Sequence, residues 1–358
     1  MHETYNVFVI NPGSTSTKLS FFKNRQEVCT ETVSHDAERL QQYQSVAAQT
    51  SFRQEILETF LNDNRIRFRH IHAVVGRGGL LKPIPSGTYR VNPEMIQDLV
   101  EAKYGEHASN LGAVLADRIA RKAGCPAYIV DPVVVDEMQP VARLSGHPMF
   151  QRKSIFHALN QKAVARQAAE MLGKSYQDCR LIVTHLGGGI SVGAHVNGRV
   201  VDVNNALDGE GPFSPERAGS VPAGDLIGLC FSGKLEEKKI RKMLVGSGGL
   251  IAYLGTHNLK EILERIKTEN SETERVLHAM GYQVCKEIGA LAAVMQGDVD
   301  AIVITGGIAF AKEFTDMIQQ YVSWISRIIV IPGEAEMDAL AAGAYRILMN
   351  EEEEREYN

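Results

Sequence analysis

Hydroxyl and amide side chains gather in one short segment near the start of the chain, from Asn11 to Lys18. It reads Asn-Pro-Gly-Ser-Thr-Ser-Thr-Lys, so the hydroxyl residues Ser14 to Thr17 stand between a glycine and a lysine. Glycine allows close backbone approach, and turn amides with hydroxyls and an ammonium group can surround a phosphate. The same residue types also make plain hairpin turns. This segment alone therefore leaves both interpretations open.

Two later segments have the same character. The apolar run 181–184 ends in His185, Leu186 and the glycines Gly187, Gly188 and Gly189, and the run 301–304 ends in Thr305, Gly306 and Gly307. Three successive glycines let backbone amides reach an anion. The glycines after Thr305 would let a flat adenine ring lie against the backbone. Tight packing of a strand on a helix is the alternative for either segment.

Two arginines stand in glycine-rich surroundings. Arg77 lies within Gly-Arg-Gly-Gly, and Arg217 lies in the glycine- and proline-rich stretch 209–219. Burying a guanidinium is costly unless it meets an anion, and arginine suits carboxylate or phosphoryl oxygens. A surface salt bridge is the other interpretation of each.

Four further polar residues are candidates for a site. Asp131 follows an apolar run, and α/β sites lie beyond the carboxyl ends of strands. His157 follows Ile155-Phe156, where a hydrogen-bonded core histidine is the common alternative. Glu334 and Glu336 precede a predicted helix, where acidic residues also serve to stabilise its N-terminus.

The pattern of apolar runs and turn residues predicts alternating strands and helices. The segment Asn11 to Lys18 would join two strands, unlike a Walker loop, which leads into a helix. We expect strands at 7–10, 18–22, 71–75, 127–130, 181–184, 191–195, 200–203, 301–304 and 327–331. We expect helices at 92–101, 108–123, 154–171, 235–244, 259–267, 271–295 and 337–349.

The two halves of the chain echo each other. Each opens with a strand, a polar glycine turn and a return strand, VFVINPGSTSTKLSFF in the first and LIVTHLGGGISVGAHV in the second. We therefore predict two similarly built α/β domains, 1–150 with the C-terminal segment 337–358 packed back on it, and 151–336. No low-complexity linker separates them, so a helix is expected to join them. The glutamates 351–354 are expected to form a solvated tail.

Composition limits the classes of function. The net charge of −5 speaks against nucleic-acid binding driven by bulk charge. The five cysteines are widely spaced and form no CxxC pair, which predicts a reducing compartment and no zinc knuckle. No apolar run approaches membrane-spanning length and the N-terminus does not resemble a signal peptide, so we expect a cytoplasmic protein without a membrane partner.

Taken in order, these segments resemble the acetate/butyrate kinase (acetokinase) family. The family's first signature is an apolar strand followed by Asn, any residue, Gly, Ser, Ser/Thr, Ser, any residue and Lys. It is matched by VFVINPGSTSTK, in which the defined positions are Asn11, Gly13, Ser14, Thr15, Ser16 and Lys18. The family's second phosphate loop resembles HLGGG, and its adenosine loop resembles ITGGIA.

Within the family, the short chain and the segments GRGG, FHALNQKA and GEGPFSPERAG are most similar to the butyrate kinases. Acetate kinases are longer and usually read RVVHGGE, FHGTSH and HLGNG. Ala73 stands where their first-domain arginine falls, with Arg77 four residues later, and Gly188 replaces the asparagine of their second loop.

The resemblance implies a fold, a reaction and roles. The fold is α/β, with two ribonuclease-H-like domains of the actin and sugar-kinase superfamily flanking an ATP cleft. The reaction is reversible phosphoryl transfer from ATP to butanoate, giving butanoyl phosphate and ADP. The glycine and hydroxyl loops hold ATP, and Mg²⁺ lies near Asn11 and Glu336, less directly near Glu334. Arg217 and His157 steady the transferred group, Arg77 holds the carboxylate, and Asp131 orients Arg217 or the metal shell. Family members tend to form homo-oligomers, dimers or larger.

Three alternatives remain open at the level of sequence. A branched-chain fatty acid, propionate or acetate kinase differs only in pocket volume, and a methylene is worth about 1–3 kcal/mol. A non-catalytic nucleotide-binding protein on the same fold is the alternative of another class. A sugar kinase would need a catalytic aspartate, and neither Asp131 nor Asp208 lies in a motif of that kind.

Overall fold

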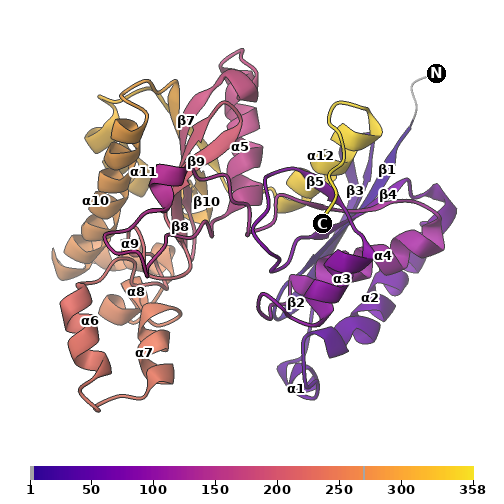
Figure 1. The fold of residues 1–358 in the computed structure, drawn as a ribbon, viewed down its shortest axis with the longest axis horizontal. Helices are drawn as coiled ribbons and strands as arrows, with labels where there is room; N and C mark the ends of the chain where they lie inside the picture. The colour runs from indigo at the N-terminus through magenta and orange to yellow at the C-terminus, as the bar shows by residue number, and fades with distance from the viewer. Residues whose placement is uncertain (1–3, 269–270) are drawn as a thin grey trace. The chain divides into compact units, whose positions relative to one another are not determined.

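The computed structural model describes residues 4–268 and 271–358. Internal contacts divide the chain into two compact units (Figure 1): unit 1 is Met1–Val135 with Ala335–Asn358, and unit 2 is Asp136–Glu334. The predicted partition into folding domains at 150 and 151 stays a prediction. The expected joining helix is wrong, because the chain is non-helical at both Val135–Asp136 and Glu334–Ala335.

Unit 1 is built on a six-stranded sheet in the order β3-β2-β1-β4-β6-β5. The first three strands are antiparallel, β1, β4 and β6 run parallel, and β5 returns antiparallel to β6. The strands are β1 (Asn6–Pro12), β2 (Ser16–Lys23), β3 (Gln26–Ser34), β4 (Ala73–Arg77), β5 (Thr88–Arg90) and β6 (Ala127–Val130). The helices are α1 (Ala37–Gln41), α2 (Thr50–Asp63), α3 (Pro93–Val100), α4 (Asn110–Ala123) and α12 (Glu336–Leu348).

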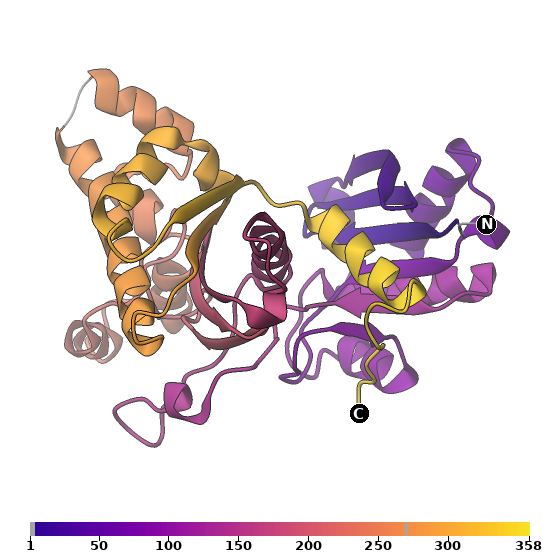
Figure 2. The same cartoon turned by 90° about the horizontal axis from the view of Figure 1, so that it is seen from above.

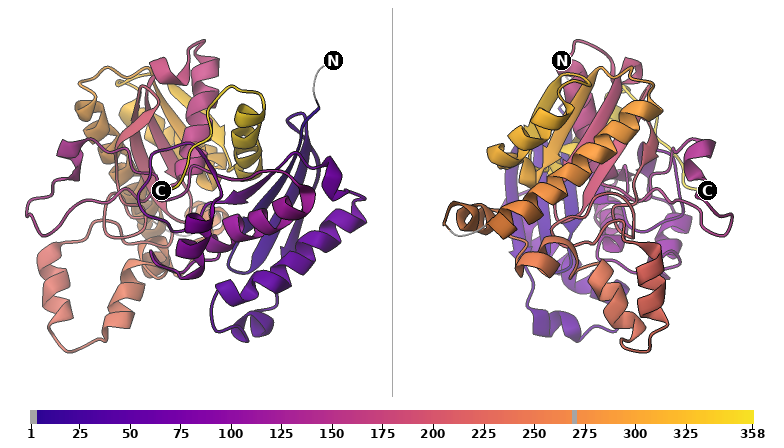
Figure 3. Two further views of the ribbon diagram at one scale, coloured as in Figure 1. Left: turned by 45° about the vertical axis from the view of Figure 1, so that its right-hand side comes forward. Right: turned by 90° about the vertical axis from the view of Figure 1, so that its left-hand side faces the viewer.

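Alternation along β1 supplies an apolar layer to each face of this sheet. Phe8 and Ile10 pack with residues of α2 and α4, such as Leu57 and Leu115, in one buried cluster. The opposite face is covered by α12, which contacts β1, β4 and β6 (Figure 3). The last helix of the chain therefore belongs to the same layered body as the first strand.

Unit 2 is built on a five-stranded sheet in the order β11-β10-β7-β8-β9. Strands β7, β8 and β9 are antiparallel, and β10 and β11 run parallel to β7. The strands are β7 (Arg180–Leu186), β8 (Ile190–Val196), β9 (Arg199–Val203), β10 (Ala301–Gly306) and β11 (Ile328–Pro332). The helices are α5 (Ala158–Met171), α6 (Ala223–Cys230), α7 (Glu237–Leu244), α8 (Gly249–Leu254), α9 (Leu259–Thr268), α10 (Ser271–Val294) and α11 (Lys312–Val322).

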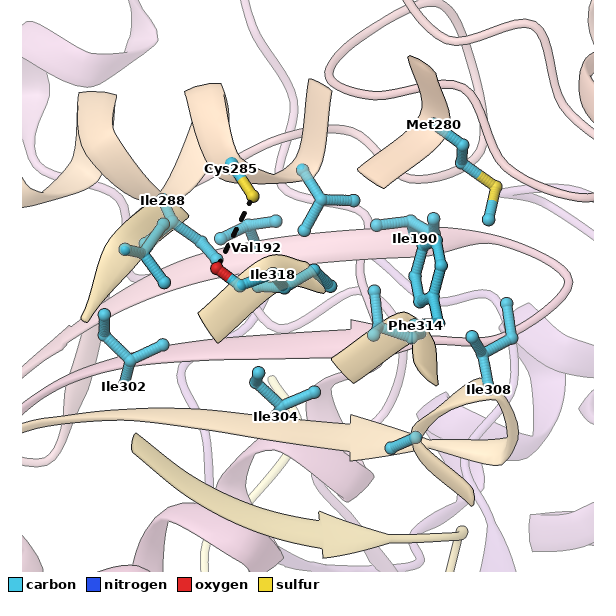
Figure 4. Packing of buried hydrophobic residues seen from close by; sticks show 14 of the residues in the cluster. Ile190, Val192, Met280, Cys285, Ile288, Ile302, Ile304, Ile308, Phe314 and Ile318 are labelled. Carbon is cyan, nitrogen blue, oxygen red and sulfur yellow. Dashed lines mark hydrogen bonds between the residues drawn. The ribbon is translucent and has the colours of Figure 1, made fainter. Parts of the chain in front are cut away.

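Helices cover both faces of this second sheet as well (Figure 2). On one face, Ile190, Ile302 and Ile304 pack against Met280 and Phe314 from α10 and α11 (Figure 4). On the other face, side chains of α5 pack on the alternate residues of β7 and β10. The central residues of β7 and β10, 181–183 and 301–304, are all apolar because both faces of these strands are buried.

The two sheets share one topology, which confirms the α/β class and the echo seen in the sequence. Three antiparallel strands, β1 to β3 in unit 1 and β7 to β9 in unit 2, are followed by parallel strands added beside the first of the three. The polar glycine turns that suggested the echo join β1 to β2 and β7 to β8. None of the helices in the described residues combines the length and apolar character that a membrane crossing requires.

The glutamates 351–354 are mostly exposed, as expected, but they are not a free tail. The helix ends at Leu348, and the glutamates after it pair with unit 1: Glu351 with Arg25 at 2.5 Å, and Glu354 with Arg90 at 3.1 Å. Arg355 then hydrogen-bonds with Thr88 and Arg90 of β5 in the manner of an added strand. The run of like charges is ordered because arginines of β5 and of the turn after β2 face it.

Candidate active site

The carboxyl ends of the parallel strands in unit 1 bring three predicted site residues to one edge. Asn11 lies near the end of β1, Arg77 ends β4, and Asp131 follows β6. The register pairs Ile10 with Gly76 and Arg77 with Val130, so the three lie on successive strands. This is the edge at which α/β sheets place their ligand sites.

Asn11, Arg77 and Glu336 form a polar cluster at that edge. The Asn11 amide donates from Nδ2 to Glu336 Oε2 at 2.7 Å, and Arg77 Nη1 lies 2.7 Å from Glu336 Oε1 and 3.4 Å from Asn11 Oδ1. Glu336 is the first residue of α12, where a carboxylate also meets the positive end of the helix dipole. Residues from three distant segments of the sequence thus meet at one point.

The turn between β1 and β2 confirms the predicted strand-to-strand loop. It is closed by a hydrogen bond from Gly13 N to Ser16 O at 2.8 Å. Ser14, Thr15 and Lys18 are exposed, whereas Thr17 is buried and bonded to His35 and Arg53. Two hydroxyls and the ammonium group are therefore accessible to a phosphate.

Asp131 holds a backbone turn. It is 2% exposed, its φ is +38°, and its Oδ1 accepts from Gly87 N at 2.8 Å while its own amide donates to Gly87 O. The predicted partner Arg217 belongs to unit 2, whereas Asp131 belongs to unit 1. The hydrogen bond from Gly87 fixes this turn, and the predicted role of Asp131 in orienting Arg217 or the metal shell stays a prediction.

In unit 2, two predicted histidines form a stacked pair. The rings of His157, at the N-terminus of α5, and His185, on β7, lie 3.8 Å apart with an interplanar angle of 11°. His157 Nδ1 lies 2.9 Å from Ser191 Oγ. The stack fixes the plane of both imidazoles.

His185 is held on both ring nitrogens. Its Nδ1 lies 2.8 Å from Asn160 Oδ1, and its Nε2 lies 3.2 Å from Glu334 Oε1. Asn160 donates its amide hydrogen to Gly333 O at 3.4 Å, which leaves its oxygen to accept from His185. Glu334 thus contacts the histidine of the second loop, while Glu336, two residues on, belongs to the cluster around Asn11.

The glycine loop after β7 is packed against Arg217. A Cβ on Gly189 would lie 2.0 Å from Arg217 Nη1, so only glycine leaves room for the guanidinium there. Arg217 donates to Ala206 O, and no carboxylate of the described residues lies within ion-pair distance of it. Burial lowers the pKa of Arg217, although its group stays cationic at neutral pH.

The predicted adenosine loop is a tight backbone crossing. Gly306 has a φ of +91°, and a Cβ there would lie 2.2 Å from Leu186 O. Its amide and carbonyl pair with Gly333, whereas Gly307 is exposed, and a Cβ on it would meet no described atom within 4 Å. Gly307 therefore presents open backbone on which a flat ring can lie.

Sequence reasoning missed several residues that hold this site. Asn160, Ser191 and Gly333 each bond to a predicted site residue. Burial, with the charge of Arg77, lowers the pKa of His107. Asn160 and Gln161 lie three and four residues after His157, a spacing that places side chains on one face of a helix. The sequence could therefore have predicted that they lie near His157. Ser191 and Gly333 carried no such signal, because their contacts depend on strand pairing.

The oxygen set at the edge of unit 1 fits Mg²⁺. No group of three His, Cys, Asp or Glu side chains with metal-binding geometry occurs in the described residues. Magnesium in nucleotide enzymes usually takes one or two carboxylates, several waters and the phosphates of the substrate. The Asn11 amide oxygen and the Glu336 carboxylate are hard oxygen ligands of this kind.

Comparisons with known proteins identify the family of this chain. A model of the Acetokinase family matches residues 146–325. Butyrate kinase 2 of Clostridium acetobutylicum is 52% identical over 353 residues, which cover 99% of each chain. The chain belongs to the acetokinase family. The predicted family is therefore confirmed.

Solved structures of the family share its fold. The acetate kinase of Porphyromonas gingivalis superimposes with a TM-score of 0.80 at 21% identity, over 96% of this chain and 100% of that one. A propionate kinase from Francisella tularensis gives a TM-score of 0.74 at 18% identity, over 95% and 98%. At these identities the likeness establishes the architecture of this acetokinase family member and leaves the choice of acid to its own side chains.

Proposed function

We propose that this chain transfers the γ-phosphoryl group of ATP to the carboxylate of butanoate, giving butanoyl phosphate and ADP, in either direction. A relative 52% identical over nearly the whole chain is named Butyrate kinase 2. In the forward reaction a carboxylate oxygen forms a bond to the γ-phosphorus, and the bond from that phosphorus to the β–γ bridging oxygen breaks. No proton has to be removed, because the carboxylate is already a nucleophile.

One observation carries the proposal: the guanidinium of Arg217, partly buried beside Gly189 and without an ion pair to any carboxylate of the described residues. Removing a charge from water without an ion-pair partner is costly, and the cost is recovered when an anion arrives. In phosphoryl transfer, charge on the equatorial oxygens is stabilised by such preorganised groups. We assign this role to Arg217.

The other residues divide the remaining tasks. His157 donates a hydrogen bond to the transferred group, and the loops at Gly187 to Gly189 and Gly306 to Gly307 hold ATP. The exposed hydroxyls of Ser14 and Thr15 and the Lys18 ammonium bind phosphate oxygens. Arg77 holds the carboxylate of the acid. Asp131 supports the Gly87 turn at the strand end.

We further propose that Mg²⁺ accompanies ATP, held by Asn11 and Glu336. The ion supplies charge neutralisation on the phosphates when bound. The ion pair between Arg77 and Glu336, at 2.7 Å, holds this carboxylate in place. Glu336→Gln should raise the Mg²⁺ concentration that half-saturates the enzyme. Half-saturation at the wild-type Mg²⁺ concentration would remove Glu336 from the metal.

Replacing Arg217 tests whether its guanidinium stabilises the transferred phosphoryl group. Arg217→Ala should lower kcat on the order of 10²- to 10³-fold while the KM for ATP changes only a few fold, because the lost contact acts on the developing charge. Arg241→Ala, which removes an exposed arginine paired with Glu237 within α7, is the matched control. Near-normal turnover of Arg217→Ala would exclude it from the chemistry.

The choice of acid is tested by comparing kcat/KM across straight and branched acids of two to five carbons. Butanoate should give the highest value, with steps of roughly 10- to 200-fold per missing methylene. A maximum at acetate, propionate or a branched acid would assign the chain to the corresponding kinase. ATP binding without turnover on any acid would favour a non-catalytic nucleotide-binding protein.

We also propose a cytoplasmic homo-oligomer, as the family resemblance implies. Helix α6 supports assembly, because it is rich in apolar residues and none of them is buried; Ile227, for example, is 58% exposed. Light scattering coupled to size-exclusion chromatography measures the assembly, and a mass of one 39.4-kDa chain would contradict it.

A further inference from the structure

A chain of buried polar side chains runs from His157 into the interior of unit 2. It passes through Ser191 on β8, Gln161 on α5, His195 on β8 and Tyr176. The first three after His157 are 0% exposed and Tyr176 is 5% exposed. None of the roles proposed above uses these four residues. Four polar groups in an apolar core are costly unless their hydrogen bonds are all satisfied.

The orientation of Gln161 is fixed by a backbone group. Its Nε2 lies 3.0 Å from the main-chain oxygen of Ser191, which can only accept, so the amide nitrogen must face Ser191. Its Oε1 therefore faces His195 Nε2, at 3.0 Å. A Cβ on Gly193 would lie 2.6 Å from this oxygen, so the strand leaves a slot for it.

The tautomer of His195 follows from that orientation. Because Gln161 Oε1 can only accept, His195 must donate from Nε2. Its Nδ1 then accepts from the Tyr176 hydroxyl at 2.8 Å. Complete burial holds the pKa of His195 well below its ordinary value, so the ring is neutral and carries a single N–H. Tyr176 thus donates to His195, and His195 donates to Gln161, so these hydrogen bonds all run in the direction of Ser191.

The hydroxyl of Ser191 connects this chain to His157. Its Oγ accepts from Gln161 Nε2 at 2.8 Å, and its other side-chain neighbour is His157 Nδ1, at 2.9 Å. A hydroxyl has one hydrogen and two lone pairs, and a buried hydroxyl hydrogen needs an acceptor. Because Gln161 Nε2 is itself a donor, Nδ1 of His157 is the side-chain acceptor that this hydrogen meets, which assigns a lone pair to Nδ1. The N–H of a neutral His157 is thereby placed on Nε2.

We propose that Ser191, Gln161, His195 and Tyr176 are positioning residues that hold His157 as the Nε2–H tautomer, so that it donates a hydrogen bond to a phosphoryl oxygen. The inference rests on the proposed function for the role of His157. The opposite tautomer would present a lone pair to an anionic oxygen. The stack on His185, 3.8 Å away, fixes the ring plane, and the hydroxyl of Ser191 fixes which nitrogen carries hydrogen.

The tautomer itself is measured first, without reference to turnover. Long-range proton–nitrogen NMR of the full chain labelled in histidine distinguishes the two ring nitrogens, and the signals of His157 are assigned by their loss in His157→Gln. The neutral wild-type ring should carry its hydrogen on Nε2. A hydrogen on Nδ1 would overturn the proposal, whatever the enzyme's activity.

Ser191→Ala then tests the connection to catalysis. Loss of one hydrogen bond to Nδ1 should lower kcat about tenfold, with the KM values for ATP and the acid within about twofold of wild type. The matched control is Ser20→Ala, which removes another strand serine of 0% exposure whose Oγ bonds to Thr30. The control should lower the melting temperature by a similar amount and leave kcat unchanged.

Tyr176→Phe is the second variant, because it leaves Ser191 and His157 intact and removes only the last hydroxyl of the chain. It should disturb the His195 signals and lower kcat less than Ser191→Ala does. A kcat of Ser191→Ala within twofold of wild type would overturn the positioning role. A normal kcat in His157→Gln would instead overturn the role of His157 in the proposed function, while the NMR result for its tautomer would stand.

Discussion

The guanidinium of Arg217 occupies the space that a side chain on residue 189 would need. The position that a Cβ would take on Gly189 is 2.0 Å from Arg217 Nη1 and 2.7 Å from its Cζ. The side chain of Arg217 is flexible enough to move away, whereas the strand end is not. A methyl group at this position would therefore displace the guanidinium and leave the fold in place.

Gly189→Ala should lower kcat by roughly 10- to 100-fold, because the displaced guanidinium loses part of its transition-state contact. Gly289→Ala on α10 is the matched control, since no described atom lies within 4 Å of its added methyl group. The comparison uses steady-state kinetics and circular dichroism of both variants. Unchanged turnover in Gly189→Ala would show that Arg217 acts from another position.

Arg77 is the second residue whose surroundings define a test. Arg77→Ala should raise the KM for the carboxylic acid about tenfold or more, because one charge-assisted contact is lost. Arg90→Ala removes a comparable ion pair with Glu354 on β5 and should leave this KM unchanged. An Arg77→Ala enzyme with a normal KM for the acid would exclude the proposed carboxylate contact.

At the scale of elements, the turn after β1 is backed by a buried polar cluster. Arg53 of α2 is 0% exposed and donates to Ser16 O at 3.0 Å and to Thr17 Oγ1 at 2.9 Å. The Thr17 hydroxyl lies 2.8 Å from His35 Nε2. Burial, with the charges of Arg53 and Arg39, lowers the pKa of His35 to about 4. The imidazole is therefore neutral in the folded state at neutral pH.

This cluster predicts a loss of stability in mild acid. The ordinary pKa of histidine is about 6.5, so between about pH 6.5 and 4 the unfolded chain binds a proton that the folded chain does not. The stabilisation is present above about pH 6.5 and is lost as the pH falls toward 4. The free energy of unfolding should drop by about 2 kcal/mol more between pH 7 and 5 in wild type than in His35→Gln. Urea denaturation at the two pH values measures it, and equal drops in the two proteins would contradict it.

The local pattern of apolar and turn residues was sufficient to predict many of the strands and helices. The strand at 127–130 was predicted with the observed bounds, and the turn at Asn11 to Lys18 was placed between two strands as found. Strand β3 was missed because it lies at the edge of the sheet and shows mostly exposed residues. Helix α2 was also missed, although Leu57, Phe60 and Leu61 supplied the i, i+3, i+4 spacing of a helix that a closer count would have found.

The site was predictable in its parts and not in its contacts. Glycine and hydroxyl density marked both turns because phosphate loops require those residue types. The meeting of Arg77 with Glu336 depends on α12 returning to the edge of β1 and β4, which no local pattern encodes. The direction of the hydrogen bonds behind His157 depends on the pairing of α5 with β8, so it too required the fold.

At the scale of the whole molecule, the segment after α12 clamps unit 1. Tyr357 is 1% exposed and donates from its hydroxyl to Asp98 Oδ2 at 2.7 Å. Lys103, with this hydroxyl, holds the pKa of Asp98 below its ordinary value. The segment thereby joins α3 to the edge strand β5.

Tyr357→Phe should lower the free energy of unfolding by about 1–2 kcal/mol, because Asp98 loses a buried partner. Tyr253→Phe is the control, since that ring is 69% exposed on α8. Thermal unfolding followed by circular dichroism compares them, while turnover at low temperature should be the same in both. Equal melting temperatures would show that the hydroxyl does not contribute.

Unit 1 is interrupted: its sheet is encoded before residue 136, and the helix that covers one face of it is encoded after residue 334. During translation, β1, β4 and β6 therefore leave the ribosome while that face of the sheet is still uncovered. Roughly 200 further residues must be synthesised before α12 is available to cover it. At about 5–20 residues per second this interval lasts on the order of 10–40 s. The second unit, continuous in sequence, can finish folding first, whereas this face of the first unit's sheet stays uncovered until the last helix is made.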